Sequence, residues 1–227
     1  MGVTHVTAKV GNPANGRLSV LVVLAAILTS TSLLTTSAAF QTSANGRDVA
    51  PAASPHWARG AAVLTWIDPE EMPPGAAELV ALAMRTWTTA AEGRFTLLNA
   101  SDASRAKLQV HFIRSQLTFG ETRPRVDRRT GQIVEVDIGL TVDTLGDALG
   151  RRIITYLTAL HELGHALGLS HRDDFSSIMY LFRDPTDSER YFGRYRRLLR
   201  SPDDIGSPWA TGLSVQDIEA LRELYDR

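Results

Sequence analysis

The sequence predicts an α+β fold: a mixed, twisted sheet of about five strands, with a long helix in the second half of the chain and a helix at the C-terminus. Three observations lead to this class. Short segments typical of strands occur between residues 62 and 140, with one helical segment among them. A longer helical segment follows, and an amphipathic segment closes the sequence. The 227 residues include no cysteine, so one hydrophobic core must stabilise a single domain.

The segments before residue 141 are expected to form the sheet. Residues 107–113 alternate polar and apolar side chains, as a strand with one buried face does. Residues 74–90 have apolar side chains at helical spacing, and Pro74 stands at a position that a first helical turn tolerates. In chain order the expected elements are strand 62–67, helix 74–90, strands 94–98, 107–113, 119–126 and 133–140, and a turn at 127–131 between the last two.

Two helices are expected in the rest of the chain. The first runs from near Thr144, or later, to Leu167. The second follows Ser214, which can cap it together with Asp217 three residues on. Its apolar stripe consists of Ile218, Leu221, Leu224 and Tyr225.

Residues 1–39 have the order of a secretory signal. Lys9 and Arg17 precede an apolar run, and small residues up to Ala39 follow it. We expect cleavage there, which makes the protein secreted, extracellular or periplasmic; if the segment is retained, it anchors the protein to a membrane. Loss of the two positive charges changes the net charge from −1 to −3, which disfavours a nucleic-acid partner.

The segment HELGHALGLSH can supply three imidazoles to one metal ion. His161 and His165 are four residues apart, so they lie on one helix face. Gly168 can adopt the left-handed conformation that ends helices, which would bring His171 back to the same ion. Three histidines with a fourth position open to water are typical of a catalytic zinc site.

The alternative is that these residues are ordinary helix histidines without a metal. The chain contains six histidines, yet three of them fall in this segment at ligand spacing, which favours a metal site. Glu162 adjoins the first of them, close enough to act as a general base on water without being a ligand.

The pattern HExxHxxGxxH resembles the zinc signature of the metzincin metallopeptidases. Within them the chain is most similar to the matrixins, including their bacterial members. This resemblance implies a metzincin-like catalytic domain at residues 60–227, after a short segment at 40–59. It implies one catalytic Zn²⁺ with three protein ligands: His161, His165 and His171.

Two further residues carry the resemblance. The tetrapeptide Ser-Ile-Met-Tyr after the third histidine resembles the metzincin Met-turn, with Met179 as its methionine. Asp217 resembles an aspartate that braces this turn, although an ordinary helix-capping acid is an equal alternative from the residues alone. Leu181, two positions after the methionine, stands where other metzincins have an additional tyrosine ligand, so none is expected here.

The chain departs from the matrixin pattern in other positions. Arg172 and Leu181 replace the serine and proline that matrixins usually have. Without cysteine, the thiolate latch of many matrixin propeptides cannot form. No cluster for a second, structural zinc is found, and His111 is expected to be a packing residue on a strand.

Residues 119–126 are expected to form the edge strand that binds an extended peptide through its main chain. The candidate substrate-binding residues are Phe119, Gly120, Glu121 and Tyr180. An ordinary surface hairpin remains the alternative. The arginine-rich segment between Leu181 and Gly212 either contacts acidic substrates or anionic envelope polymers, or forms a solvated helical face, which is the more ordinary explanation.

The resemblance therefore implies a zinc endopeptidase that acts on protein or peptide substrates; the N-terminal signal adds the expectation of secretion, and we expect a monomer. A zinc-activated water would attack the peptide bond, with Glu162 as the general base. The alternative is a catalytically weak, zinc-bearing binding or adhesion module of the cell envelope.

Overall fold

The computed structural model describes residues 54–114, 118–142, 146–184 and 186–226. In this part of the chain, five strands form one sheet in the order β2-β1-β3-β5-β4. The strands are β1 (Ala61–Ile67), β2 (Phe95–Asn99), β3 (Leu108–Ile113), β4 (Gly120–Val126) and β5 (Ile133–Thr141). β4 is antiparallel to β5, and all other neighbours are parallel. The predicted α+β class with a mixed five-stranded sheet is confirmed.

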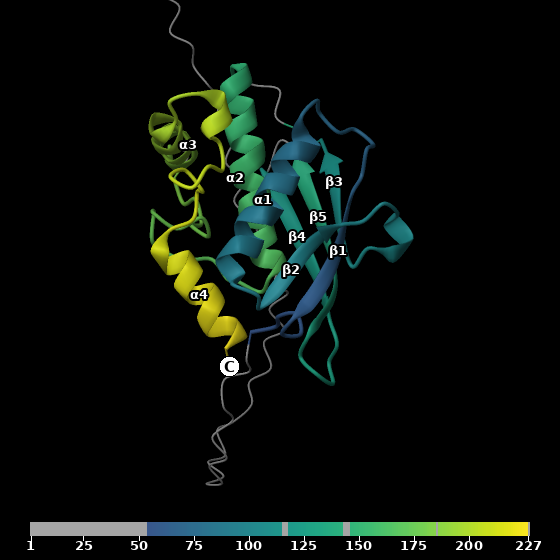
Figure 1. Cartoon of the computed structure of the whole chain (residues 1–227). Helices are drawn as coiled ribbons and strands as arrows, with labels where there is room; N and C mark the ends of the chain where they lie inside the picture. Colours follow the sequence, from purple (N-terminus) through teal and green to yellow (C-terminus); the bar gives the residue numbers. More distant parts are fainter. Residues whose placement is uncertain (1–53, 115–117, 143–145, 185, 227) are drawn as a thin grey trace, which may run out of the picture.

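Four α-helices in the described part of the chain accompany the sheet, and Figure 1 shows how they are arranged. They are α1 (Ala76–Ala91), α2 (Ala148–Ala166), α3 (Asp187–Leu198) and α4 (Val215–Tyr225). The two long helices α1 and α2 lie side by side against the sheet, and α3 and α4 flank them. Among the residues that the structure describes, no helix has both the length and the apolar character needed to span a bilayer.

The core lies between the sheet and the two long helices. On β3, Leu108, Val110 and Phe112 are buried, whereas the residues between them are partly exposed, as the alternating sequence pattern predicted. Trp87 of α1 is fully buried, and its indole N–H donates to the carbonyl oxygen of Leu160 on α2 at 2.8 Å. This bond joins the two helices at a point one residue before the histidine motif.

The long helix α2 begins at Ala148 and is capped by Asp147, whose carboxylate accepts from the N–H of Gly150 at 2.7 Å. Thr144, the earliest start expected from the sequence, lies outside the described residues. The same holds for the predicted signal at residues 1–39 and for most of the segment at 40–59.

Candidate metal centre

Three histidines from the end of α2 and the loop after it converge on one point. His161 and His165 lie one turn apart on the helix, and His171 returns to them from the loop. Ligand atoms of all three lie within 4.8 Å of one another, and the two Nε2 atoms of His165 and His171 are 3.1 Å apart. Two nitrogens bound to one tetrahedral zinc ion are about 3.4 Å apart, so the spacing fits this metal.

Main-chain carbonyl groups orient the two helical imidazoles. Nδ1 of His161 lies 2.6 Å from the carbonyl oxygen of Ile178, and Nδ1 of His165 lies 2.8 Å from that of Leu169. Because a carbonyl oxygen only accepts, each Nδ1 must carry the hydrogen, and each Nε2 then presents a lone pair. The sequence could not identify these acceptors, since every residue has a carbonyl group.

Burial also keeps the histidines neutral. It lowers the pKa of His161 to about 3, with a smaller contribution in the same direction from the imidazole of His165. Burial lowers the pKa values of His165 and His171 as well. Neutral imidazole is the form that binds zinc, so both the geometry and the protonation of this donor set fit the metal.

Gly168 allows the chain to leave α2 toward the third histidine. Its φ of 100° lies in the region that favours glycine. A Cβ atom at this position would be 2.1 Å from the carbonyl oxygen of Pro55, so a side chain is excluded by contact as well as by backbone conformation.

A tight turn at residues 177–180 packs beside the histidines, closed by a bond from the N–H of Tyr180 to the carbonyl oxygen of Ser177 at 3.2 Å. The sulfur of Met179 lies against α2, so close that a Cβ at Gly164 would be 2.4 Å from it. The fully buried Asp217 of α4 accepts from the hydroxyl of Ser177 and, at 3.0 Å, from the N–H of Ile178. The aspartate therefore holds the turn that orients His161.

Glu162 is buried next to the first histidine, with 5% of its surface exposed. Burial raises the pKa of Glu162 to about 7, although a hydrogen bond from the Thr122 hydroxyl opposes this shift. Oγ1 of Thr122 lies 2.6 Å from Oε2 of Glu162 and 3.0 Å from its carbonyl oxygen. A carboxyl group with a pKa near neutrality can both take up and release a proton, as a general base must. Sequence reasoning missed Thr122, because nothing in a strand pattern shows which helix residue it contacts.

β4 packs over this carboxylate, and no strand among the described residues pairs with its outer edge. Thr141 donates its N–H to the carbonyl oxygen of Phe119 at 2.9 Å, so these two residues form a hydrogen-bonded pair of the antiparallel ladder. The pattern alternates, and Gly120 and Thr122 therefore direct their N–H and C=O groups away from β5. Pro124 is the next outward position and has no N–H to offer. An extended peptide can thus pair with a short stretch of this edge.

The four candidate substrate-binding residues have different surroundings. Gly120 lies against Glu162, where a Cβ would be 2.8 Å from Cγ and Oε1. The ring of Phe119 packs edge-on against Phe192 of α3, with 5.2 Å between centroids. Glu121 forms an ion pair of 2.7 Å with an arginine of the same strand, and the Tyr180 hydroxyl donates to Asp187 at 3.0 Å. Of the four, Gly120 is the residue that packs against the Glu162 carboxylate.

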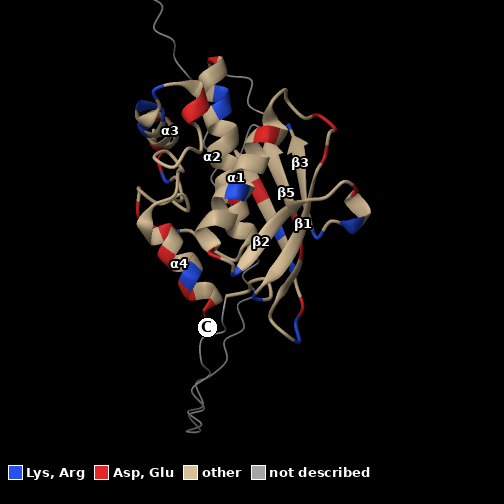
Figure 2. Ribbon diagram, viewed as in Figure 1, with Lys and Arg blue, Asp and Glu red and all other residues tan. Residues whose placement is uncertain are grey.

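Part of the arginine-rich segment after the turn forms α3, and Figure 2 colours the ribbon of this helix at its basic and acidic positions. Tyr191 and Tyr195 are buried on its inner face. Arg196 forms an ion pair of 2.7 Å with Asp147 at the start of α2, and the Arg194 guanidinium lies over the ring of Phe175. These arginines therefore have partners within the domain.

His111 is a packing residue with a polar partner as well. Its ring lies edge-on to Trp66 at 6.1 Å, and Nδ1 is 2.9 Å from Oδ2 of Asp68. Within the described ranges, the only group of side chains suited to hold a metal ion is that of the three motif histidines.

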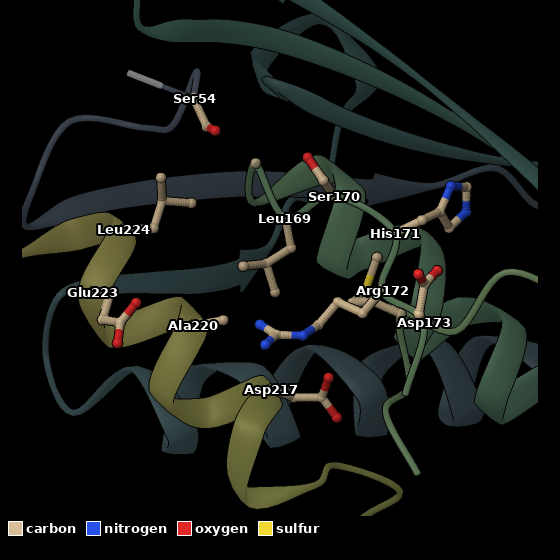
Figure 3. Close-up of a pocket in the computed structure, with 12 residues that line it drawn as sticks. Ser54, Leu169, Ser170, His171, Arg172, Asp173, Asp217, Ala220, Glu223 and Leu224 are labelled. Carbon is tan, nitrogen blue, oxygen red and sulfur yellow. The ribbon is translucent and has the colours of Figure 1, made fainter. Parts of the chain in front are cut away.

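A cavity of about 520 Å³ opens between α4 and the loop after α2 (Figure 3). The side chain of Arg172 extends into this cavity toward α4, and Asp217 and Leu224 line the wall that α4 forms. His171 forms part of its rim, with the ring directed away from the cavity. Neither β4 nor Glu162 lines this space, so it is distinct from the free strand edge described above.

In a comparison with known protein families, residues 144–193 match the family model Matrixin. This stretch includes the three histidines, Glu162 and Met179. A search of curated proteins finds no match. The matched segment and the converging histidines together support a matrixin-like domain of the metzincin type.

Proposed function

We propose that this protein is a secreted zinc-dependent endopeptidase with protein or peptide substrates. The observation that carries the proposal is the convergence of three neutral imidazoles beside the buried carboxyl group of Glu162. The matrixin match over residues 144–193 supports the same class of enzyme.

In the proposed mechanism, His161, His165 and His171 hold one zinc ion. Such an ion is a Lewis acid that polarises a carbonyl group and lowers the pKa of water. Glu162 accepts a proton from the attacking water and then delivers it to the nitrogen of the leaving amine. Burial raises the pKa of the Glu162 carboxyl group, which favours uptake of the proton that the second step delivers.

We further propose that the substrate binds in extended form along β4. The outward N–H and C=O groups of Gly120 and Thr122 would pair with its main chain. Because the peptide would run antiparallel to β4 and Glu162 lies at Gly120, residues before the cleaved bond would lie along Thr122. Residues after the bond would extend toward Phe119.

The central experiment is a peptidase assay on purified protein, with casein or a fluorogenic peptide, in the presence and absence of a chelator. We expect one zinc ion per chain and hydrolysis that the chelator abolishes. Glu162→Gln should abolish hydrolysis and retain zinc, because the amide cannot accept the proton. Near wild-type turnover in this variant would remove Glu162 from the mechanism.

The same assay separates the alternative function. A wild-type protein that binds zinc but hydrolyses none of a broad set of peptides would be a zinc-bearing binding or adhesion module of the cell envelope.

Export needs a separate test. If the signal is removed, the N-terminal sequence of the exported protein should begin at Phe40. Recovery of the intact N-terminus from the membrane fraction would instead indicate an anchor. We also propose a monomer, since one chain supplies every residue of the site.

A further inference from the structure

We propose that Thr122 is a positioning residue that holds the general-base carboxylate of Glu162 in its working orientation. This inference rests on the proposed peptidase function. It concerns a residue of the edge strand that belongs neither to the histidine motif nor to the set of substrate-binding residues expected from the sequence.

The first observation is the contact itself. The Thr122 hydroxyl lies within hydrogen-bonding distance of two acceptors on one residue, Oε2 of Glu162 at 2.6 Å and its carbonyl oxygen at 3.0 Å. Among the residues that the structure describes, no other side chain is hydrogen-bonded to this carboxylate. The Thr122 hydroxyl thus contacts both the carboxylate of Glu162 and the main-chain carbonyl group of the same residue, which limits the movement of the carboxylate relative to α2.

The second observation is the packing of β4 on Glu162. Gly120 and Thr122 are two positions apart on the strand, so they face the same side of the sheet. Gly120 leaves the space that the carboxylate occupies, since a Cβ would lie 2.8 Å from Oε1. With 5% of Glu162 exposed, loss of the Thr122 donor would leave Oε2 with little access to water as a substitute partner.

The two carboxylate oxygens consequently have different roles. Oε2 is held by Thr122, which leaves Oε1 to accept the proton from the attacking water. The main-chain N–H and C=O of Thr122 point outward, to where the peptide would pair. One residue therefore fixes the base through its side chain and the substrate through its backbone, which aligns the two groups that must react.

The test compares Thr122→Val, Thr122→Ser and, as a matched control, Thr96→Val on β2 at the opposite edge of the sheet. We expect Thr122→Val to lower kcat about 10- to 100-fold, because a misplaced catalytic group reacts slowly. KM should stay within about twofold of wild type, since the outward main-chain groups are unchanged. Thr122→Ser should restore kcat to within about threefold, and Thr96→Val should leave both constants unchanged. Zinc content should be the same in all variants.

A crystallographic comparison adds a readout that does not depend on turnover. Glu162 should occupy one position in wild-type protein and in Thr122→Ser, and a different position or several positions in Thr122→Val. An unmoved Glu162 or a wild-type kcat in Thr122→Val overturns the proposal, as does equal loss of kcat in the valine and serine variants. A raised KM with unchanged kcat also overturns it, because Thr122 would then act only in substrate binding. If the wild-type protein has no peptidase activity, the proposed function fails while the position of Glu162 still decides the role of Thr122.

Discussion

Asp217 and His161 are connected through one residue, Ile178. Oδ2 of Asp217 accepts from the Ile178 N–H at 3.0 Å, and the Ile178 carbonyl oxygen lies 2.6 Å from Nδ1 of His161. The C-terminal helix therefore helps to orient an imidazole of the metal centre. We therefore expect the stability of the domain and the proposed affinity for zinc to depend on the same residue.

Replacement of Asp217 should weaken both properties. We expect Asp217→Ala to lower the free energy of unfolding by about 2–4 kcal/mol, because the buried Ile178 N–H and Ser177 hydroxyl lose their acceptor. The affinity for zinc should fall about 10- to 100-fold as the turn loosens. Denaturant unfolding and zinc titration measure the two effects. Asp217→Asn, whose amide oxygen still accepts, should show smaller losses, and wild-type zinc affinity in folded Asp217→Ala would contradict the link.

Removal of the third histidine should release the metal. His171→Ala leaves two imidazoles, so metal analysis of the purified variant should show a sharply reduced zinc content. His111→Ala is the matched control, because His111 lies outside the metal-binding group, and it should retain the wild-type content. If His171→Ala kept full stoichiometry, the third ligand would lie elsewhere.

Two helical glycines should respond oppositely to alanine. At Gly164 the new methyl group would lie 2.4 Å from the sulfur of Met179 and 3.3 Å from Trp87, so overpacking should cost about 1–3 kcal/mol. At Gly193 of α3 the nearest atom is 3.7 Å away, and the higher helix propensity of alanine should add up to about 1 kcal/mol. Thermal or denaturant unfolding measures both changes. Equal stability of the two variants would show that the sulfur does not press on α2.

The ion pair between Asp147 and Arg196 should stabilise the domain in a pH-dependent way. Hydrogen bonds from the Arg196 guanidinium, and then from the Gly150 N–H, lower the pKa of Asp147 from 3.8 to about 2. A depressed pKa in the folded state means that the stabilisation is present above pH 3.8 and is lost as pH falls toward 2.

Asp147→Ala should therefore have a lower Tm than wild type at pH 7, and the difference should shrink as pH is lowered through this range. Asp147→Asn keeps the helix cap but loses the ion pair, so its Tm should be intermediate. Thermal unfolding followed by circular dichroism across the pH range measures these differences. A difference between wild type and Asp147→Ala that stays constant down to pH 2 would exclude the carboxylate as its cause.

The sequence predicted much of the fold because local patterns determined it. The alternation on β3 and the capping pair of Ser214 and Asp217 depend on neighbouring residues alone, and both elements occur where they were expected. The five strand segments follow from the same local patterns, whereas the mixed directions of the strands were implied by the resemblance to the metzincins. The start of α2 was harder to predict from the sequence, because the capping residue Asp147 is also bound by Arg196, which is far away in the chain.

In the candidate site, too, the features set by local sequence could be predicted, and the contacts between separate elements could not. The spacing of the three motif histidines follows from helix geometry and one glycine, so the sequence was sufficient to place them together as candidates. The contact of Thr122 with Glu162 and the pairing of His111 with Asp68 depend on how separate elements pack. The carbonyl acceptors of His161 and His165 could not be predicted either, since a main-chain group carries no signature of residue type.

Pro124 has a consequence for the behaviour of the protein at high concentration. An exposed sheet border is a template on which a second copy of the chain can add a strand, which is how fibrils start. The missing N–H of Pro124 interrupts that template. The exposed Arg123 and Arg125 on either side are ion-paired with Glu121 and Glu135, so this part of the edge carries charged side chains, which disfavour strand addition. The stretch of β4 that can pair with a substrate peptide is therefore short, and we expect it not to support strand addition between copies of the domain.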